Sequence, residues 1–304
     1  MIYTITLNPS IDYVVHTPSL ELGALNKANT CMTFAGGKGI NVSRMLHELS
    51  YDTTALGFTG GFTGDFITGE LKTAGLATDF TPIQDDSRIN IKLKSETETE
   101  INAPGPTITA QEADALLHQL DGISDQDTLI LSGSTPPSLS HSFRQQLIQR
   151  MAQTGAQLVF DTTGEALKTA LSFKPLIVKP NQHELAEFFG VTLHNRQDIS
   201  RCGQKLLDLG ARHALVSLGG DGALLLTDNG VYHGSAPTGQ VKNSVGSGDS
   251  MIAGFTGKWA ETGDVTDAFL LSLAAGSATA FSDDLAERGA IEDLTKNITI
   301  QRID

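Results

Sequence analysis

A regular alternation of two patterns constrains the fold of this 304-residue chain more than any other feature of its sequence. Short runs of apolar or β-branched residues recur, beginning with residues 2–7, and most are followed by a stretch with the spacing of a helix. Such an alternation is typical of a mostly parallel sheet that is covered by helices on both faces. The runs at 53–58, 128–132, 157–161 and 176–179 precede helical patterns at 64–74, 140–153, 164–171 and 182–189, and a helical pattern at 198–209 leads into a run at 213–218.

Two stretches interrupt this alternation, because strand patterns follow one another there without a helix between them. In residues 88–94, isoleucine and leucine alternate with asparagine and lysine, which is the period of a half-exposed antiparallel strand. We expect the two insertions to pair into a small sheet that stands off the main domain as a lid, although an antiparallel edge of the main sheet fits the same pattern. The strand patterns lie at 12–16 and 29–34 in the first insertion, near residues 12–34, and at 88–94 and 98–102 in the second, near residues 88–103.

Composition excludes several classes of protein. No run approaches the eighteen or so apolar residues that span a membrane, and the N-terminus has no basic residue before Lys27, unlike a secretory signal. Cys31 and Cys202 are too few and too far apart in sequence for a disulfide framework or a metal site. We therefore expect a single cytoplasmic domain over residues 1–304 that interacts with no membrane.

The net charge of −14 bears on the kind of ligand that the chain can bind. No basic stripe for nucleic acid is visible, so we expect no nucleic-acid partner. Acidity also disfavours anions at long range, so that any phosphate site must be built locally from backbone amides and a few cations. The sequence contains no Walker-type phosphate loop, and Met251 stands at the third glycine position of a dinucleotide fingerprint.

The strongest chemical signal lies in residues 243–255. Small residues at Gly246, Ser247 and Gly248 precede an apolar helical pattern, and backbone amides at a helix N-terminus can bind an anion without any side chain. Asp249 then falls in the first helical turn. An aspartate there is commonly a helix cap, but a cap does not explain the glycines around it. An acid beside a phosphate site is the pattern of a base for phosphoryl transfer.

A second polar segment follows the buried run that ends at Lys179. Asn181 and Glu184 lie three residues apart at a helix start, so their side chains share a face. Their oxygens suit Mg²⁺ held through water beside nucleotide phosphates. The same spacing is also that of a capping box, and on the residues alone the capping box is favoured.

Glycine-rich segments occur at two further places. Residues 217–222 lie between two apolar runs and fit either a hairpin turn or a backbone surface against a nucleotide. Residues 35–44 form a glycine loop that contains Lys38 and opens a helix, which suits an anion. Asp12 and Asn41 supply short polar groups that can bind hydroxyl groups.

These segments, in this order and at these distances, resemble the ribokinase-like (PfkB) family of carbohydrate kinases. Residues 246–255 match the C-terminal signature of that family, and residues 36–44 begin its N-terminal one. The resemblance covers essentially the whole chain. Segments 6–12, 36–44 and 88–92 make it similar to the bacterial branch that phosphorylates fructose 1-phosphate or tagatose 6-phosphate, in which Lys38 replaces a glycine of the fructose 6-phosphate branch. Ser247 departs from the alanine that the family more often has.

The resemblance implies a ribokinase-like three-layer α/β/α fold with a β-sheet lid that often serves for dimerisation, so that a homodimer through the lid is expected. It also implies ATP as co-substrate and Mg²⁺. It assigns a general base to Asp249, an anion hole to the amides of Gly246, Ser247, Gly248 and Asp249, nucleotide contacts to Lys179, Ser217, Leu218, Gly219, Gly220, Asp221 and Gly222, sugar-phosphate contacts to Asp12, Gly37, Lys38, Asn41 and Arg88, and the Mg²⁺ environment to Asn181, Glu184 and Asp161.

The activity that the resemblance implies is transfer of the ATP γ-phosphoryl group to the 6-hydroxyl of fructose 1-phosphate, which gives fructose 1,6-bisphosphate. Tagatose 6-phosphate is the alternative acceptor. A sugar-phosphate sensor without activity on the same fold is an alternative of a different class. The presence of Asp249 together with its glycines favours the enzyme.

Overall fold

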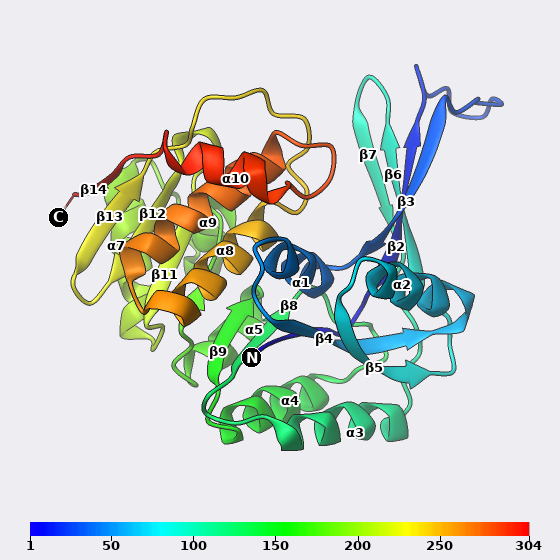
Figure 1. Cartoon of the computed structure of the whole chain (residues 1–304), viewed down its shortest axis with the longest axis horizontal. Coiled ribbons are helices and arrows are strands. Elements are labelled where there is room, and N and C mark those ends of the chain that lie inside the picture. Colours follow the sequence, from blue (N-terminus) through cyan, green and yellow to red (C-terminus); the bar gives the residue numbers. More distant parts are fainter. Residues whose placement is uncertain (304) are drawn as a thin grey trace.

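The computed structural model describes residues 1–303, which form two sheets flanked by helices (Figure 1). The large sheet contains β1 (Ile2–Thr6), β4 (Thr53–Gly60), β5 (Ala77–Ile83), β8 (Thr128–Ser132), β9 (Gln157–Asp161), β10 (Ile177–Val178), β11 (His213–Ser217), β12 (Ala223–Thr227), β13 (Gly230–Gly234) and β14 (Ile300–Arg302). The small sheet contains β2 (Ser10–His16), β3 (Thr30–Gly36), β6 (Arg88–Lys94) and β7 (Glu98–Asn102). The α-helices are α1 (Lys38–Glu48), α2 (Gly61–Thr73), α3 (Ala110–Gln119), α4 (His141–Gln153), α5 (Gly164–Leu171), α6 (Gln182–Phe189), α7 (Arg196–Asp208), α8 (Ser247–Thr262), α9 (Val265–Ala280) and α10 (Arg288–Thr295).

The large sheet is mostly parallel, as the alternation of patterns predicts. Its order is β14-β13-β12-β11-β10-β9-β8-β1-β4-β5, with every pair from β11 to β5 parallel and β12, β13 and β14 added as antiparallel strands. Parallel strands bring their carboxyl ends to one edge, where ligands bind in open α/β sheets. The polar residues that follow β1, β9, β10 and β11 therefore meet at one edge of the sheet.

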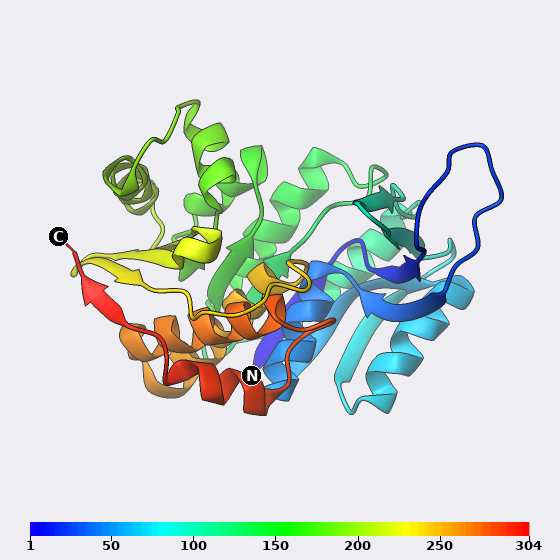
Figure 2. The same cartoon turned by 90° about the horizontal axis from the view of Figure 1, so that it is seen from above.

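Helices cover both faces of the large sheet, which gives three layers (Figure 2). The core on one face includes buried side chains from α1, α8, α9 and α10, and the cores on the other face draw on α3 and α4 and on α5, α6 and α7. The three-layer prediction is confirmed. No helix in the described residues is both long and apolar enough to cross a membrane.

Helix α8 is held unusually deep, and one glycine permits it. Nine consecutive residues from Asp249 to Gly257 are buried. A Cβ added at Gly254 would lie 2.7 Å from the carbonyl oxygen of Leu271 in α9, so α8 and α9 approach this closely because residue 254 has no side chain. This packing fixes the N-terminus of α8 at the carboxyl edge of the sheet.

The small sheet stands off the main body, with the order β3-β2-β6-β7 (Figure 1). The predicted separate sheet is thus confirmed, whereas its action as a lid stays a prediction. The pairing of β6 differs in one respect from the expected antiparallel arrangement. Strand β6 is antiparallel to its neighbour β7, but it runs parallel to its other neighbour, β2. A parallel pair needs a long connection, and residues 17–87 supply it by passing through the main domain.

The two faces of the small sheet are reversed relative to an ordinary half-exposed sheet. Asn90 and Lys92 are buried, with 7% and 9% of their surface exposed, while Ile89 and Ile91 on the opposite face are 39% and 37% exposed. The polar face is covered because it forms one wall of a cavity with the main domain. The apolar face is open to solvent.

Candidate active site

A cavity of about 990 Å³ lies between the carboxyl edge of the large sheet and the polar face of the small sheet. Almost every residue that the sequence singles out meets in it, although the segments are far apart along the chain. Leu218 and Asp221 do not line it, because Leu218 packs against the core on the α5–α7 side and Asp221 is exposed. The predicted residues that line it are Asp12, Gly37, Lys38, Asn41, Arg88, Asp161, Lys179, Asn181, Glu184, Ser217, Gly219, Gly220, Gly222, Gly246, Ser247, Gly248 and Asp249.

The N-terminus of α8 opens into the cavity without a side-chain cap. Gly246 is the N-cap residue, with φ of 80°, a left-handed conformation that favours glycine. Within residues 1–303, no side chain accepts a hydrogen bond from the Gly248 or Asp249 amide, whereas the Ser247 amide donates to the Ser244 carbonyl at 3.4 Å. The Gly248 and Asp249 N–H groups and the positive end of the helix dipole therefore remain available to an anion.

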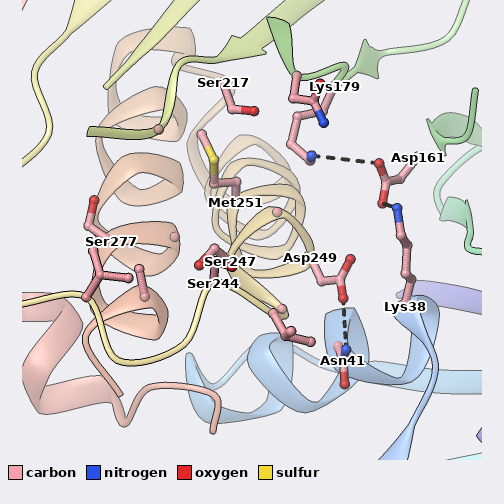
Figure 3. Close-up of a pocket in the computed structure, with 18 of the residues that line it drawn as sticks. Lys38, Asn41, Asp161, Lys179, Ser217, Ser244, Ser247, Asp249, Met251 and Ser277 are labelled. Atoms are coloured by element: carbon pink, nitrogen blue, oxygen red, sulfur yellow. Dashed lines mark hydrogen bonds and ion pairs between the residues drawn. The ribbon is translucent and has the colours of Figure 1, made fainter. Parts of the chain in front are cut away.

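Asp249 is buried in the first turn of α8 and does not cap it. Only 5% of its surface is exposed, and its Oδ2 accepts a hydrogen bond of 2.8 Å from Asn41 Nδ2 in α1 (Figure 3). Burial and, to a smaller extent, the nearby charge of Asp161 raise the pKa of Asp249 to about 7, against the opposing effects of Lys38, the Asn41 hydrogen bond and Lys179. A carboxyl group with this pKa can accept a proton and release it again near neutral pH.

Asp161, at the end of β9, joins two lysines from different parts of the chain (Figure 3). Its Oδ2 lies 3.3 Å from Lys38 Nζ and accepts a hydrogen bond of 3.1 Å from Ser132 Oγ, and its Oδ1 lies 3.8 Å from Lys179 Nζ. The two cations lower the pKa of Asp161 and hold it ionised against the effect of burial. The Asp161 carboxylate in turn raises the pKa of Lys38.

Lys38 and Arg88 flank the same loop of the main domain. Lys38 Cβ lies 3.4 Å from the position that a Cβ on Gly133 would occupy, and Arg88 Nη2 donates to Ser134 Oγ at 3.4 Å. Arg88 also donates from Nε to the Asn8 carbonyl and from Nη1 to the Ala103 carbonyl. These bonds fix the plane of the guanidinium, and the remaining N–H groups are free to hold an anion at this corner of the cavity.

Asn181 and Glu184 form a capping box at the start of α6, as one of the two sequence interpretations has it. Asn181 Oδ1 accepts from the Glu184 amide at 2.8 Å, and Glu184 Oε2 accepts from the Asn181 amide at 2.9 Å. The capping box uses one oxygen of each side chain, so Oε1 of Glu184 remains for another partner. Both residues also line the cavity.

The side-chain oxygens of the cavity can hold Mg²⁺ only if a bound substrate supplies further ligands to the ion. Within residues 1–303, no three His, Cys, Asp or Glu side chains gather closely enough to hold a metal ion. The oxygens of Asp161 already face two lysines and a serine. Mg²⁺ commonly keeps several waters and binds one or two carboxylates plus substrate phosphates, and Asn181 with Glu184 fits that mode.

Residues 217–222 form a hairpin turn between β11 and β12, which is one of the two interpretations that the sequence allows. The Leu218 amide donates to the Gly222 carbonyl at 2.9 Å, and Gly222 has φ of 86°. A Cβ at Gly222 would lie 1.9 Å from the Gly234 carbonyl oxygen. The turn still presents the backbone of Gly219 and Gly220 to the cavity.

The polar residues of the cavity that the sequence interpretation missed include Ser10, Asn90 and Lys92. All three lie on the polar face of the small sheet, next to Asp12. The alternation in residues 88–94 is visible in the sequence, but it does not reveal which face of the strand is covered. The signal that could have found them is the alternation of polar and apolar residues in a strand that has no helical pattern beside it, since such a sheet can turn its polar face to the main domain.

Comparison with known proteins gives a consistent result. Residues 5–288 match the model of the pfkB family carbohydrate kinases. The chain is 43% identical over its whole length to the whole of a 1-phosphofructokinase of Bacillus subtilis, and 37% identical over the whole of both chains to a D-tagatose-1-phosphate kinase of Bacillus licheniformis. The solved structure of phosphofructokinase-2 from Escherichia coli in complex with fructose-6-phosphate superposes with a TM-score of 0.91 at 29% identity, covering 97% of this chain and 98% of that one.

Replacement of Asp249 by Asn tests how much folding stability the protein loses by burying an ionised carboxylate at residue 249. Because the folded-state pKa of about 7 lies above that of an unfolded aspartate, the folded protein loses stability as pH rises from about 4 to about 7 and the carboxyl ionises. Asn has no charge to bury. At pH 8 we expect the free energy of unfolding of Asp249→Asn, measured by urea titration, to exceed that of the wild type by on the order of 2–4 kcal/mol. This difference in unfolding free energy should narrow toward pH 4.

The exposed Asp114→Asn provides the matched control, and its unfolding should follow the wild type at both pH values. An Asp249→Asn protein that is no more stable than the wild type at pH 8 would show that the buried carboxylate carries no such cost.

Proposed function

The chain belongs to the pfkB family of carbohydrate kinases, and from this we propose that it transfers the γ-phosphoryl group of ATP to the 6-hydroxyl of D-fructose 1-phosphate, giving D-fructose 1,6-bisphosphate. The observation that carries the proposal is the buried Asp249 at the uncapped, cavity-facing N-terminus of α8. A proton acceptor and an anion site then lie side by side, as phosphoryl transfer to a hydroxyl requires.

Asp249 is proposed as the general base. A sugar hydroxyl is far too weak an acid to be ionised beforehand by a carboxylate, so Asp249 orients the hydroxyl and accepts its proton as the bond to phosphorus forms. Asn41 holds Asp249 Oδ2 by its hydrogen bond, which directs the other oxygen toward the acceptor. The amides of residues 246–249 stabilise the charge on the transferred phosphoryl group.

The nucleotide is proposed to lie along the turn at 217–222, with Lys179 near its phosphates. Support comes from the backbone of Gly219 and Gly220, which lines the cavity, and from the buried ammonium group of Lys179. Mg²⁺, when bound, supplies positive charge that neutralises the phosphates. Asn181 and Glu184 are proposed to hold it through water, while Asp161 keeps Lys38 and Lys179 in position.

The sugar phosphate is proposed to bind between the large and small sheets. Lys38 and Arg88 hold its phosphate, and Asp12, the Gly37 backbone and Asn41 contact its hydroxyl groups. Closure of the small sheet over the cavity would exclude water, which otherwise competes as acceptor. This arrangement directs the 6-hydroxyl toward Asp249.

The competing acceptors are ketohexose phosphates that differ from fructose 1-phosphate only slightly. The relative from Bacillus licheniformis, named for D-tagatose 1-phosphate, makes the C4 epimer the strongest competitor, ahead of tagatose 6-phosphate. The relative from Bacillus subtilis, named 1-phosphofructokinase, is more similar in sequence and favours fructose 1-phosphate. A sensor without activity is disfavoured, because these relatives are both named as enzymes that act on sugar phosphates.

A homodimer through the small sheet is also proposed. Tyr13, Ile91 and Ile101 are neighbours in register on β2, β6 and β7, and each is 36–60% exposed on the outer face. Contiguous exposed apolar side chains are typical of protein interfaces. A second copy of the chain would cover this face and leave the polar face to the substrate.

A panel of acceptors with ATP and Mg²⁺ tests the proposed reaction. We expect kcat/KM to be highest for fructose 1-phosphate, and Asp249→Asn to reduce kcat by about 10²- to 10⁴-fold with little change in the binding of either substrate. Higher kcat/KM with tagatose 1-phosphate, tagatose 6-phosphate or fructose 6-phosphate would reassign the substrate. Normal turnover by Asp249→Asn would remove it as the base.

Alanine replacement of Lys38 and of Arg88 tests the proposed phosphate corner. Each change should raise the KM for fructose 1-phosphate by about 10- to 150-fold, since a charged hydrogen bond contributes about 1.5–3 kcal/mol. The KM for ATP should change little. Arg150→Ala, which removes a partly exposed arginine that is paired with Asp121 and does not line the cavity, is the control. Loss of ATP affinity with a normal acceptor KM would assign these cations to the nucleotide instead.

Glu184→Gln tests the proposed Mg²⁺ environment without disturbing the helix, because glutamine also serves in a capping box. The Mg²⁺ concentration at half-maximal activity should rise roughly 10-fold at fixed ATP. Glu112→Gln is the matched control, since Glu112 occupies the same position in the capping box of α3. An unchanged Mg²⁺ midpoint with normal kcat would leave Glu184 as a cap only.

Lysine at Ile91 or Ile101 tests the proposed dimer. Burying an unpaired lysine in an apolar interface should raise the dissociation constant at least about 100-fold, as measured by sedimentation equilibrium. Leu209→Lys, at another exposed apolar residue, should leave the molar mass unchanged. A wild type that is already monomeric, or an Ile91→Lys protein with the wild-type dissociation constant, would rule out this interface.

A further inference from the structure

A hydrogen-bonded cluster on the polar face of the small sheet forms part of the cavity wall. Asp12 on β2 and Asn90 on β6 are directly paired in the register of the sheet. Asp12 Oδ1 accepts from Ser10 Oγ at 2.8 Å and from Asn90 Nδ2 at 3.1 Å, and its Oδ2 lies 3.0 Å from Lys92 Nζ. The charge of Lys92 is thus balanced by that of Asp12.

The orientation of the Asn90 amide follows from these bonds. Asn90 Nδ2 donates to Asp12 Oδ1 and also to Ser10 Oγ at 3.1 Å, so both of its hydrogens are used. Ser10 gives its own hydrogen to Asp12 and can only accept from Asn90. A flipped amide would set the oxygen of Asn90 against the Asp12 carboxylate, so the network holds Nδ2 toward Asp12 and Oδ1 away from it.

Asn90 Oδ1 is left as a buried acceptor with no donor. No hydrogen-bond partner reaches it among residues 1–303, although 93% of the residue surface is buried. Asn90 is also one of the residues that line the cavity. Buried polar groups are nearly always hydrogen-bonded, so a buried acceptor without a partner, on a residue that lines the cavity, calls for a donor on the ligand.

We propose that Asn90 is a specificity-determining residue whose Oδ1 accepts a hydrogen bond from a hydroxyl group of the acceptor sugar. The inference rests on the proposed function, since it concerns the acceptor of the same reaction. It adds a residue that the sequence interpretation did not assign to the site.

The chemistry of the cluster selects a hydroxyl group rather than a phosphate. Asn90 Oδ1 and the Asp12 carboxylate present electron pairs to the ligand, and an anionic oxygen has none of the hydrogens that they need. Lys38 and Arg88, at the corner beside Ser134, offer donors instead. The cavity therefore has a donor corner for the phosphate and, on the small sheet, a wall for hydroxyl groups in which the cation of Lys92 is paired with Asp12, and this polarity orients the sugar.

The inference is tested with fructose 1-phosphate and its 3-deoxy and 4-deoxy analogues as acceptors, each with wild type, Asn90→Ala and Asn297→Ala. Removal of the hydroxyl group that meets Asn90 should lower the wild-type kcat/KM by about 5- to 150-fold, because the acceptor is then left buried and unpaired. Asn90→Ala should lose this preference and treat the parent and that analogue alike. Asn297 is the control, because it is an exposed asparagine that does not line the cavity.

The outcomes separate the inference from the proposed function. If the wild type phosphorylates fructose 1-phosphate but accepts both deoxy analogues equally well, the inference is overturned and the proposed function stands, whether or not Asn90→Ala folds. The same holds if Asn90→Ala keeps the wild-type preference. If the wild type phosphorylates no ketohexose phosphate, both are overturned.

Discussion

A single carboxylate, Asp249, is buried where backbone amides point into a cavity, and the rest of the site is arranged around it. Its burial follows from the depth of α8, which depends on the contact between Gly254 and α9. Burial raises the pKa of the carboxyl group, and the adjacent Asp161 acts in the same direction. Lys38, Lys179 and the Asn41 amide counter this effect and bring the pKa to about 7.

The chain is acidic overall, but cations gathered in the cavity give it a local site for anionic substrates. The overall charge of −14 repels phosphates at long range, yet three of the cations that line the cavity, Lys38, Arg88 and Lys179, come from separate segments of the chain. Asp161 contacts Lys38 and Lys179, one through each carboxylate oxygen, and offsets part of their charge. The proposed acceptor and nucleotide positions are thus linked through one carboxylate.

Much of the fold follows from local patterns, since each run of apolar residues needs a helix to cover it and parallel strands bring their ends together. The helix start at 246–249 is equally local, because small residues and an acid in one turn are visible in the sequence. The residues that were missed depend on tertiary structure. Asn90 and Lys92 are buried only because the small sheet turns its polar face to the main domain.

Two other features show the same limit. Leu218 and Asp221 belong to a glycine-rich segment that does reach the cavity, but a turn directs alternate side chains to different surroundings, and no pattern in the sequence gives those directions. Asn181 and Glu184 form the capping box that their spacing indicates. The spacing cannot tell whether the free oxygen of Glu184 also faces a ligand, because that depends on the loop of the next strand.

The dependence of kcat/KM for fructose 1-phosphate on pH tests the central claim most directly, with Asp249 as the base that must be ionised in the free enzyme. The account predicts that log kcat/KM is level above pH about 8 and falls below pH about 7 with a slope approaching one. A profile that stays level down to pH about 5, where an ordinary aspartate is still ionised, would contradict it.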